Sequence, residues 1–387
     1  MMSSRLRVLQ VMDSLAVGGT ETYVLSLIKT FPALGIQPSY AGAGGVLYEA
    51  FARAGCPIHY VDLTAEQLLA PQWKEDTELA LLQVMRHRRI DLVHVHQTPS
   101  GLYAAAAARR LGIPVVFTVH GAYYAPDQLR FMSDYGCAFV SVSVPVQTYL
   151  ARQGIPSALI ANGVDFEQFH FAPSVELRES LGIPSHEPVI VYASRLAWDK
   201  AAVCAMLIRA ARSVRMEDRL PLHVVVAGSG NQYGAIAELA GTANNDYGTT
   251  FVHMVGSQTH MRGYYGLGDL VVGTGRVALE AMACGKPVLA IGNHGYFGLV
   301  EKESYEEAWG YYFGDHASKQ RPDEQLIASA LRHAFASPER LAELGRDARG
   351  WAMSQFNIHD KATAMKELYV SLLGPASAGR HNEGGVS

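Results

Sequence analysis

Two positively charged side chains follow one expected strand in the second half of the chain. Arg195 comes just after the expected strand 189–192, and Lys200 lies at the start of the next expected helix. A guanidinium and an ammonium group in a strand-end loop suit a diphosphate, whose charge must be neutralised when it leaves. A surface ion pair with Asp199 is the alternative. The pair therefore indicates either a diphosphate site or a solvated salt bridge.

A second candidate phosphate contact lies further along the chain. Gly273, Thr274 and Gly275 precede an expected helix, and glycines at that point leave backbone N–H groups open to an anion. Arg276 is either another phosphate contact or a helix-surface residue. Glu280, on the same helix, can accept hydrogen bonds from a ribose diol. The same residue types also suit a helix that only packs closely on a sheet.

Three further loops combine a strand end with glycine. Gly228 and Gly230 follow the expected strand 222–226, and Gly256 follows the strand after it. They allow either tight turns or the close approach of a nucleobase. Gly18 and Gly19 open a helix after the first expected strand and could bring backbone N–H groups to an anion, or form a plain turn. None of these loops matches a dinucleotide-binding fingerprint or a P-loop.

His120 ends an expected strand in the first half of the chain. A histidine at a strand end can donate a hydrogen bond to a substrate hydroxyl or take part in proton transfer. A structural histidine with satisfied hydrogen bonds is the alternative.

Buried parallel strands that alternate with helices are expected to position these residues. The expected strands are 6–12, 39–43, 58–62, 92–96, 115–120 and 138–142 in the first half, and 189–192, 222–226, 250–254, 270–272 and 287–291 in the second. This pattern predicts an α/β fold of two Rossmann-like, doubly wound domains. Ligands of such sheets lie beyond the carboxyl ends of the strands, so a site in a cleft between the two domains is expected.

The expected boundary follows the motif Asn-Gly-Val-Asp at 162–165. Residues 1–171 form the first domain and 172–357 the second. The helix 358–373 is expected to pack back on the first domain, and 374–387 to be disordered.

Composition excludes several classes of protein. The chain has 387 residues, 49% of them hydrophobic, and a net charge of −4, which does not favour nucleic-acid binding. Its four cysteines lie far apart, as in neither a zinc site nor a disulfide framework. No apolar run reaches a membrane span of roughly 20 residues, and no secretory signal is evident. A cytoplasmic protein is expected.

The basic run 86–89 is either a solvated helix end or a patch for an acceptor or a membrane surface.

The stretch LEAMACGKPVLA at 279–290 resembles the C-terminal signature of glycosyltransferase family 4, whose members are retaining enzymes of the GT-B fold. The motifs GGTETYV, VHG, NGVD, SRL…DK and GSG occur before it in the family's order. The resemblance extends from Arg5 to about Leu373.

This resemblance implies a role for each candidate residue. Gly18 and Gly19 would approach the donor phosphate and the acceptor side of the cleft, and His120 would contact the donor sugar. Arg195 and Lys200 would hold the diphosphate, Glu280 the ribose, and Gly228, Gly230 and Gly256 would help frame the base. Family members use no essential metal, so no cofactor is expected beyond the donor substrate itself.

The chain departs from the family pattern in the loop before Glu280. The family has a glutamate where Val272 stands, and Gly273-Thr274-Gly275 replaces the usual Glu-Gly-Phe-Gly run. That glutamate normally touches the donor sugar. A glutamate-free loop is similar to that of the inverting GT-B enzymes of peptidoglycan synthesis. The donor sugar and the stereochemistry therefore stay open, and Arg276 is a candidate substitute contact.

The expected reaction is the transfer of a sugar from a nucleoside diphosphate, UDP in the first instance, to an acceptor hydroxyl. The acceptor is a carbohydrate, a lipid-linked molecule or a small molecule, with peripheral membrane contact as one option. Acceptor specificity is expected to depend on the first-domain loops 44–48, 63–73 and 122–127. Their aromatic residues either stack on a sugar or lipid or serve only in packing; they are Tyr48, Trp73, Tyr123 and Tyr124. The alternatives are a sugar-nucleotide 2-epimerase and a catalytically silent nucleotide-sugar-binding module.

Overall fold

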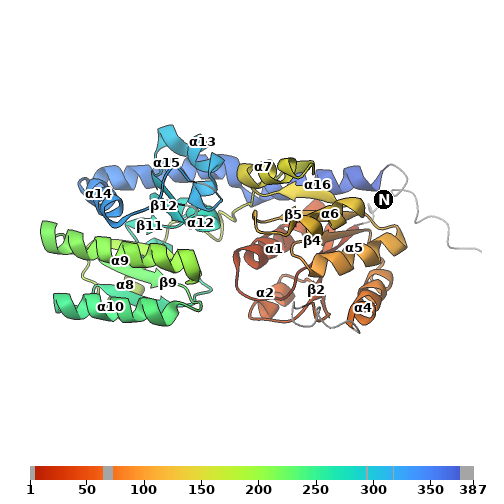
Figure 1. Cartoon of the computed structure of the whole chain (residues 1–387), viewed down its shortest axis with the longest axis horizontal. Coiled ribbons are helices and arrows are strands. Elements are labelled where there is room, and N and C mark those ends of the chain that lie inside the picture. Colours follow the sequence, from red (N-terminus) through yellow and green to blue (C-terminus); the bar gives the residue numbers. More distant parts are fainter. Residues whose placement is uncertain (1–4, 64–72, 293–294, 317, 375–387) are drawn as a thin grey trace, which may run out of the picture. The chain divides into compact units, whose positions relative to one another are not determined.

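A computed structural model describes residues 5–63, 73–292, 295–316 and 318–374 (Figure 1). The chain divides into two compact units. Unit 1 joins the chain up to Gly163 with the segment from Ile358 onwards, and unit 2 is Val164–Asn357. The division therefore falls between Gly163 and Val164, inside the Asn-Gly-Val-Asp motif, and not after residue 171. Val164 belongs to unit 2 because its backbone N–H donates to the Phe356 carbonyl (2.7 Å). The segment expected to be disordered lies outside the described residues, apart from Gly374.

Unit 1 is built on a seven-stranded parallel sheet in the order β3-β2-β1-β4-β5-β6-β7. The strands are β1 (Leu6–Val11), β2 (Ile36–Gly42), β3 (Ile58–Tyr60), β4 (Leu92–Val95), β5 (Val115–Val119), β6 (Ala138–Ser141) and β7 (Ser157–Leu159). Strand β7 was not expected from the sequence. It is a three-residue edge strand whose Ser-Ala-Leu sequence is only partly buried, so it lacks the apolar run of the inner strands.

Helices cover both faces of this sheet, which is why its inner strands are apolar throughout. They are α1 (Gly19–Thr30), η1 (Phe31–Leu34), α2 (Tyr48–Arg53), α4 (Trp73–His87), α5 (Ser100–Leu111), α6 (Pro126–Asp134), α7 (Val144–Arg152) and α16 (Ile358–Leu373). The C-terminal helix α16 packs against α1 and η1. Its Met365 and Tyr369 are fully buried in one core cluster together with Val8 of β1 and Tyr23 of α1.

Unit 2 contains a six-stranded sheet in the order β10-β9-β8-β11-β12-β13. The strands are β8 (Val189–Ala193), β9 (His223–Ala227), β10 (Val252–Gly256), β11 (Leu270–Val272), β12 (Val288–Gly292) and β13 (Gly295–Leu299). All pairs are parallel except that of β13, which runs antiparallel to β12. Strand β13 was not expected from the sequence, because its glycines are typical of a loop. Gly295 and Gly298 both have positive φ in the structure.

The helices of unit 2 follow its strands. They are α8 (Val175–Ser180), α9 (Trp198–Asp218), α10 (Tyr233–Tyr247), α11 (Met261–Leu267), α12 (Gly275–Ala283), η2 (Lys302–Ser304), α13 (Tyr305–Gly310), η3 (Tyr312–Gly314), α14 (Glu324–Phe335) and α15 (Pro338–Phe356). Within the described ranges, no helix of either unit has the length and apolar character that crossing a membrane requires.

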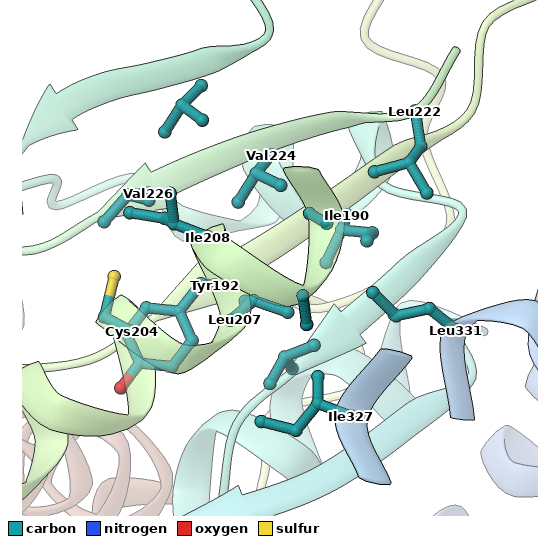
Figure 2. Packing of buried hydrophobic residues seen from close by; sticks show 14 of the residues in the cluster. Ile190, Tyr192, Cys204, Leu207, Ile208, Leu222, Val224, Val226, Ile327 and Leu331 are labelled. Carbon is teal, nitrogen blue, oxygen red and sulfur yellow. The ribbon is translucent and has the colours of Figure 1, made fainter. Parts of the chain in front are cut away.

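The long helix α9 anchors the core of unit 2 (Figure 2). Its residues Cys204, Leu207 and Ile208 lie against side chains of β8 and β9, and Leu331 of α14 joins the same cluster. Burying one such aliphatic side chain contributes roughly 1.5–3 kcal/mol. This packing fixes the start of α9, and with it Lys200, relative to the carboxyl ends of the strands.

Candidate active site

The candidate residues of unit 2 gather at the carboxyl edge of its sheet. The order of the strands reverses between β8 and β11, where a doubly wound sheet binds ligands. Arg195 follows β8, Gly228 follows β9, Gly256 ends β10 and Gly273 follows β11. Because these strands are parallel, their following loops lie at the same edge. The sequence-based expectation thus puts Arg195, Lys200 and the glycine loops around one switch point.

Lys200 is held beside the start of α12 by a carboxylate. Its Nζ lies 3.1 Å from Asp315 Oδ1, and the Thr274 hydroxyl donates to the same oxygen at 3.0 Å. Burial alone raises the pKa of Asp315, but the neighbouring positive charges, above all Lys200, and the hydrogen bonds outweigh it. The pKa therefore lies below its usual value. Asp315 thus stays ionised and keeps the ammonium group at this edge of the sheet.

The N-terminus of α12 lies beside the Asp315 carboxylate. Thr274 is its N-cap residue, yet the side chain does not cap the helix because its hydroxyl points to Asp315. Gly275 has a φ of +52°, and a Cβ there would come within 3.0 Å of Tyr312 and 3.1 Å of the Asp315 carboxylate. Backbone N–H groups and the helix dipole favour negative charge at such a position.

Gly228 and Gly230 have a packing role. A Cβ on Gly228 would collide with the Ser194 carbonyl oxygen, and one on Gly230 with the Leu196 carbonyl oxygen. The Leu196 backbone N–H also donates to the Ser229 carbonyl at 2.9 Å. The space beside these two glycines is therefore filled by the loop that carries Arg195, so the two loops form one rigid pair.

The substitution Gly228→Ala tests this packing. We expect it to lower the free energy of unfolding by about 1–3 kcal/mol, because the neighbouring backbone has to move. Gly234→Ala in α10 is the matched control. Nothing lies within 4 Å of a Cβ there, and alanine is the better helix former. Urea unfolding of both variants is the measurement, and equal midpoints would contradict the packing role.

Gly256 differs from these two glycines. It has a φ of +71°, and a Cβ there would meet nothing within 4 Å. Its carbonyl accepts a hydrogen bond from the Gly228 N–H at 2.8 Å. The positive φ explains why a glycine stands in this loop. The open space beside Gly256 is compatible with a nearby base, and that contact stays a prediction.

Glu280 and Arg276 form a largely buried ion pair on α12. Arg276 Nε lies 2.7 Å from Glu280 Oε1, and the Tyr265 hydroxyl donates to Oε2 at 3.1 Å. Burial raises the pKa of Glu280, an effect that these two partners partly offset. Arg276 is not a helix-surface residue, since its side chain is only 10% exposed. A ribose at Glu280 would share a carboxylate that Arg276 and Tyr265 already orient.

The position at which the family carries a glutamate lies in the interior of unit 2. Val272 is fully buried in the core cluster that also contains Tyr192 and Leu289. Gly273 comes next, and a Cβ there would collide with the Val277 side chain. The groups of this loop that remain for a ligand are therefore its backbone and Thr274.

In unit 1, a glutamine connects the ends of two strands with the start of α1. Gln97 Oε1 accepts from the Asp13 backbone N–H at 2.7 Å, and Gln97 Nε2 donates to Glu21 Oε1 at 2.9 Å. Burial raises the pKa of Asp13 to about 6, assisted by the charge of Glu21 and opposed by a hydrogen bond with Ser100. These contacts fix the start of α1.

The glycines at the start of α1 leave their backbone accessible. Gly18 is the N-cap and provides no side-chain cap, and a Cβ on Gly19 would meet nothing within 4 Å. Gly18, Gly19 and His120 all belong to unit 1, whereas the other predicted site residues belong to unit 2.

His120 follows β5 and contacts a histidine that the sequence analysis did not single out. His120 Nε2 lies 3.3 Å from His96 Nδ1, at the end of the neighbouring strand β4. The spacing of His94 and His96, next to a strand end, is the signal that could have identified them. Asp315 carries no comparable signal, because it lies far along the chain from Lys200 and outside any motif.

Two tyrosines in the segment 122–127 form an aromatic platform. Tyr123 is 71% exposed and stacks on the buried Tyr124 with ring centroids 4.6 Å apart. The Tyr124 hydroxyl donates to the His96 carbonyl at 2.9 Å. Tyr48 is also exposed. In the expected acceptor loop 63–73, residues 64–72 lie outside the described residues.

Comparison with protein families agrees with both units. The model "Glycosyltransferase Family 4" matches residues 17–168, and "Glycosyl transferases group 1" matches residues 174–351. The chain belongs to glycosyltransferase family 4. The family that the sequence motifs indicated is thereby confirmed, and its members are enzymes.

Two relatives of this family-4 chain are named after different molecules. It is 27% identical over 315 residues to D-inositol 3-phosphate glycosyltransferase of Gordonia bronchialis, covering 72% of this chain and 65% of that protein. It is 25% identical over 309 residues to alpha-monoglucosyldiacylglycerol synthase of Streptococcus pneumoniae, covering 71% and 68%. The match thus spans about two thirds of the length of these relatives.

Solved structures confirm the fold. Anabaena HepE in complex with UDP and glucose matches with a TM-score of 0.76 and 19% identity, over 95% of this chain and 100% of that chain. The family-4 chain therefore has the expected GT-B fold of two Rossmann-like α/β units, with one antiparallel edge strand added in unit 2.

Proposed function

We propose that this protein transfers a sugar from a UDP-sugar to an acceptor hydroxyl, with retention of configuration. One observation carries the proposal: the Lys200 ammonium is held by Asp315 beside the N-terminus of α12, at the switch point of unit 2. The ammonium group, its carboxylate partner and the positive end of the α12 dipole thus lie together where family 4 would hold a diphosphate. That HepE binds UDP supports the choice of nucleotide.

The proposed chemistry breaks the bond between the sugar's anomeric carbon and the β-phosphate oxygen. The electron pair of that bond leaves with the diphosphate. Arg195, Lys200 and the backbone N–H groups of α12 stabilise the developing charge. The acceptor oxygen bonds to the anomeric carbon on the same face and passes its proton to the departing phosphate. This route uses no enzymic nucleophile, and we propose that the protein cations take the place of a metal.

We place the acceptor on unit 1. The open backbone of Gly18 and Gly19 and the exposed Tyr123 ring lie in loops that follow its strands. A flat aromatic ring suits the apolar face of a sugar or another ring. The acceptor is a carbohydrate, a lipid-linked molecule or a small molecule.

A donor panel tests the proposed activity. The full chain is incubated with UDP-, GDP- and ADP-sugars, and nucleotide release is followed by chromatography. We expect slow release of UDP from a UDP-sugar, because water replaces the missing acceptor. A silent binding module would release none, and a 2-epimerase would change the sugar while leaving it attached to the nucleotide. Either result would overturn the proposal.

Arg195→Ala tests the phosphate site. Arg195 is exposed at the edge of the sheet. We expect UDP affinity, measured by calorimetry, to fall about 10- to 100-fold, as a charge-assisted hydrogen bond contributes about 1.5–3 kcal/mol. Arg346→Ala, an exposed arginine on α15, is the control and should bind UDP as the wild type does. Unchanged UDP binding by Arg195→Ala would show that the phosphate lies elsewhere.

A further inference from the structure

His120 stands at the end of a buried chain of hydrogen bonds in unit 1. His96 Nδ1 lies 3.3 Å from His120 Nε2, and His96 Nε2 lies 2.8 Å from Gln10 Oε1. Gln10 lies on β1 and His96 follows β4, and both are fully buried. This series of hydrogen bonds therefore crosses three neighbouring strands of the sheet, β1, β4 and β5, and ends at His120, a predicted site residue.

The positions of the protons show which atom donates in each of these hydrogen bonds. Burial holds the pKa of His96 well below its usual value, and the nearby His94 and His120 lower it further, so the ring is neutral and carries one N–H. The Gln10 oxygen can only accept, so the proton of His96 lies on Nε2. His96 Nδ1 is then an acceptor, and the hydrogen bond at 3.3 Å requires that His120 Nε2 donates.

We propose that Gln10 and His96 are positioning residues that keep a proton on His120 Nε2, directed at His96, so that the neutral form of the ring has Nδ1 as its acceptor nitrogen, the atom that we assign to a hydroxyl of the donor sugar. The sugar contact rests on the proposed function, whereas the tautomer does not. Neighbouring groups commonly set which imidazole nitrogen carries the proton. Neither Gln10 nor His96 needs to touch substrate.

The surroundings keep the His96 ring in place. The His94 ring lies against it with centroids 4.1 Å apart. His94 in turn pairs through Nδ1 with the Tyr369 hydroxyl (2.6 Å) and through Nε2 with the Thr118 hydroxyl (2.7 Å). Since Tyr369 lies on α16, the C-terminal helix supports this arrangement from one side.

Nitrogen NMR measures the tautomer directly. The full chain is labelled with ¹⁵N-histidine, and long-range ¹H–¹⁵N correlations of His120, assigned with His120→Gln, show which nitrogen carries the proton. We expect Nε2–H in the wild type. Gln10→Leu and His96→Phe remove the constraint and should give a mixture of both tautomers.

Thr118→Val is the matched control, because it removes a buried hydrogen bond from the His94 branch only. It should leave the His120 tautomer unchanged. Circular dichroism confirms that each variant is folded. A wild-type His120 protonated at Nδ1 would mean that the Gln10 amide is reversed, and would overturn the proposal. An unchanged tautomer in both Gln10→Leu and His96→Phe would overturn it as well.

Turnover separates this proposal from the proposed function. Gln10→Leu is expected to lower kcat about 10- to 100-fold, by analogy with the loss of hydrogen-bond partners behind metal-ligating histidines. Wild-type turnover in a variant whose tautomer has shifted would overturn the assignment of Nδ1 to the sugar. If no sugar nucleotide is consumed even by the wild type, the proposed function fails, and the NMR result still decides the role of Gln10 and His96.

Discussion

Replacing Lys200 with alanine is expected to lower kcat/KM for the UDP-sugar about 100- to 1000-fold, the cost of removing one preorganised group that stabilises a developing charge. Asp315 holds the ammonium group at 3.1 Å, beside the start of α12. The loss should exceed the effect on UDP affinity, because the charge on the phosphate grows as the glycosidic bond breaks.

Lys302→Ala, which removes an exposed lysine from the same unit, is the control and should leave the kinetics unchanged. Asp315→Asn adds a second comparison. It keeps Lys200 but removes the carboxylate that holds it, so an intermediate loss is expected. Steady-state kinetics and UDP calorimetry on all three variants give the answer. If Lys200→Ala turned over at the wild-type rate, the diphosphate could not lie at the start of α12.

Replacing Asp13 with asparagine should stabilise the protein at neutral pH and not at acid pH. The pKa of Asp13 is raised from 3.8 to about 6, chiefly by burial. The folded chain therefore binds this proton more tightly than the unfolded chain. Stability falls as pH rises from about 4 to about 6, where the carboxyl has to ionise in the folded state. Each pKa unit corresponds to 1.36 kcal/mol, so the expected gain above pH 7 is about 3 kcal/mol.

Urea unfolding at pH 4.5 and pH 7.5 measures this difference. Asp134→Asn, at an exposed position on α6, removes the same charge without the burial and should show no comparable dependence on pH. A gain for Asp13→Asn that is equal at both pH values would contradict the assignment. A carboxylate that costs stability at the ligand edge of a sheet is typical of a group kept for function. We therefore expect the more stable variant to lose activity.

The sequence predicted most of the fold because inner parallel strands must be apolar on both faces. The expected strand 270–272 coincides with β11, and the other inner strands were placed within a few residues. The two strands that were missed, β7 and β13, both lie at sheet edges, where this pattern weakens. The unit boundary differed from the expected one because Val164 bonds to the distant Phe356, a contact that no local pattern encodes.

The candidate site was only partly accessible to sequence reasoning. Loops after parallel strands can be placed at one edge from topology alone, which is how Arg195 and Thr274 were brought together. The partners that orient the site lie far away in sequence. Asp315 reaches Lys200 across more than a hundred residues, and Gln10 reaches His96 from another strand. Such pairs depend on the folded backbone, and composition gives no sign of them.

The split composition of unit 1 has a consequence for how the protein is made. Ile358, Met365 and Tyr369 of α16 complete the hydrophobic core that Val8 and Tyr23 begin. The first 163 residues leave the ribosome before this helix is synthesised. The apolar surface that α16 covers in the folded protein is therefore exposed on the nascent first unit while Val164–Asn357 is synthesised. Unit 2, being continuous, can finish folding first. Biogenesis would then proceed from the middle of the chain outward, with the last helix as the closing step.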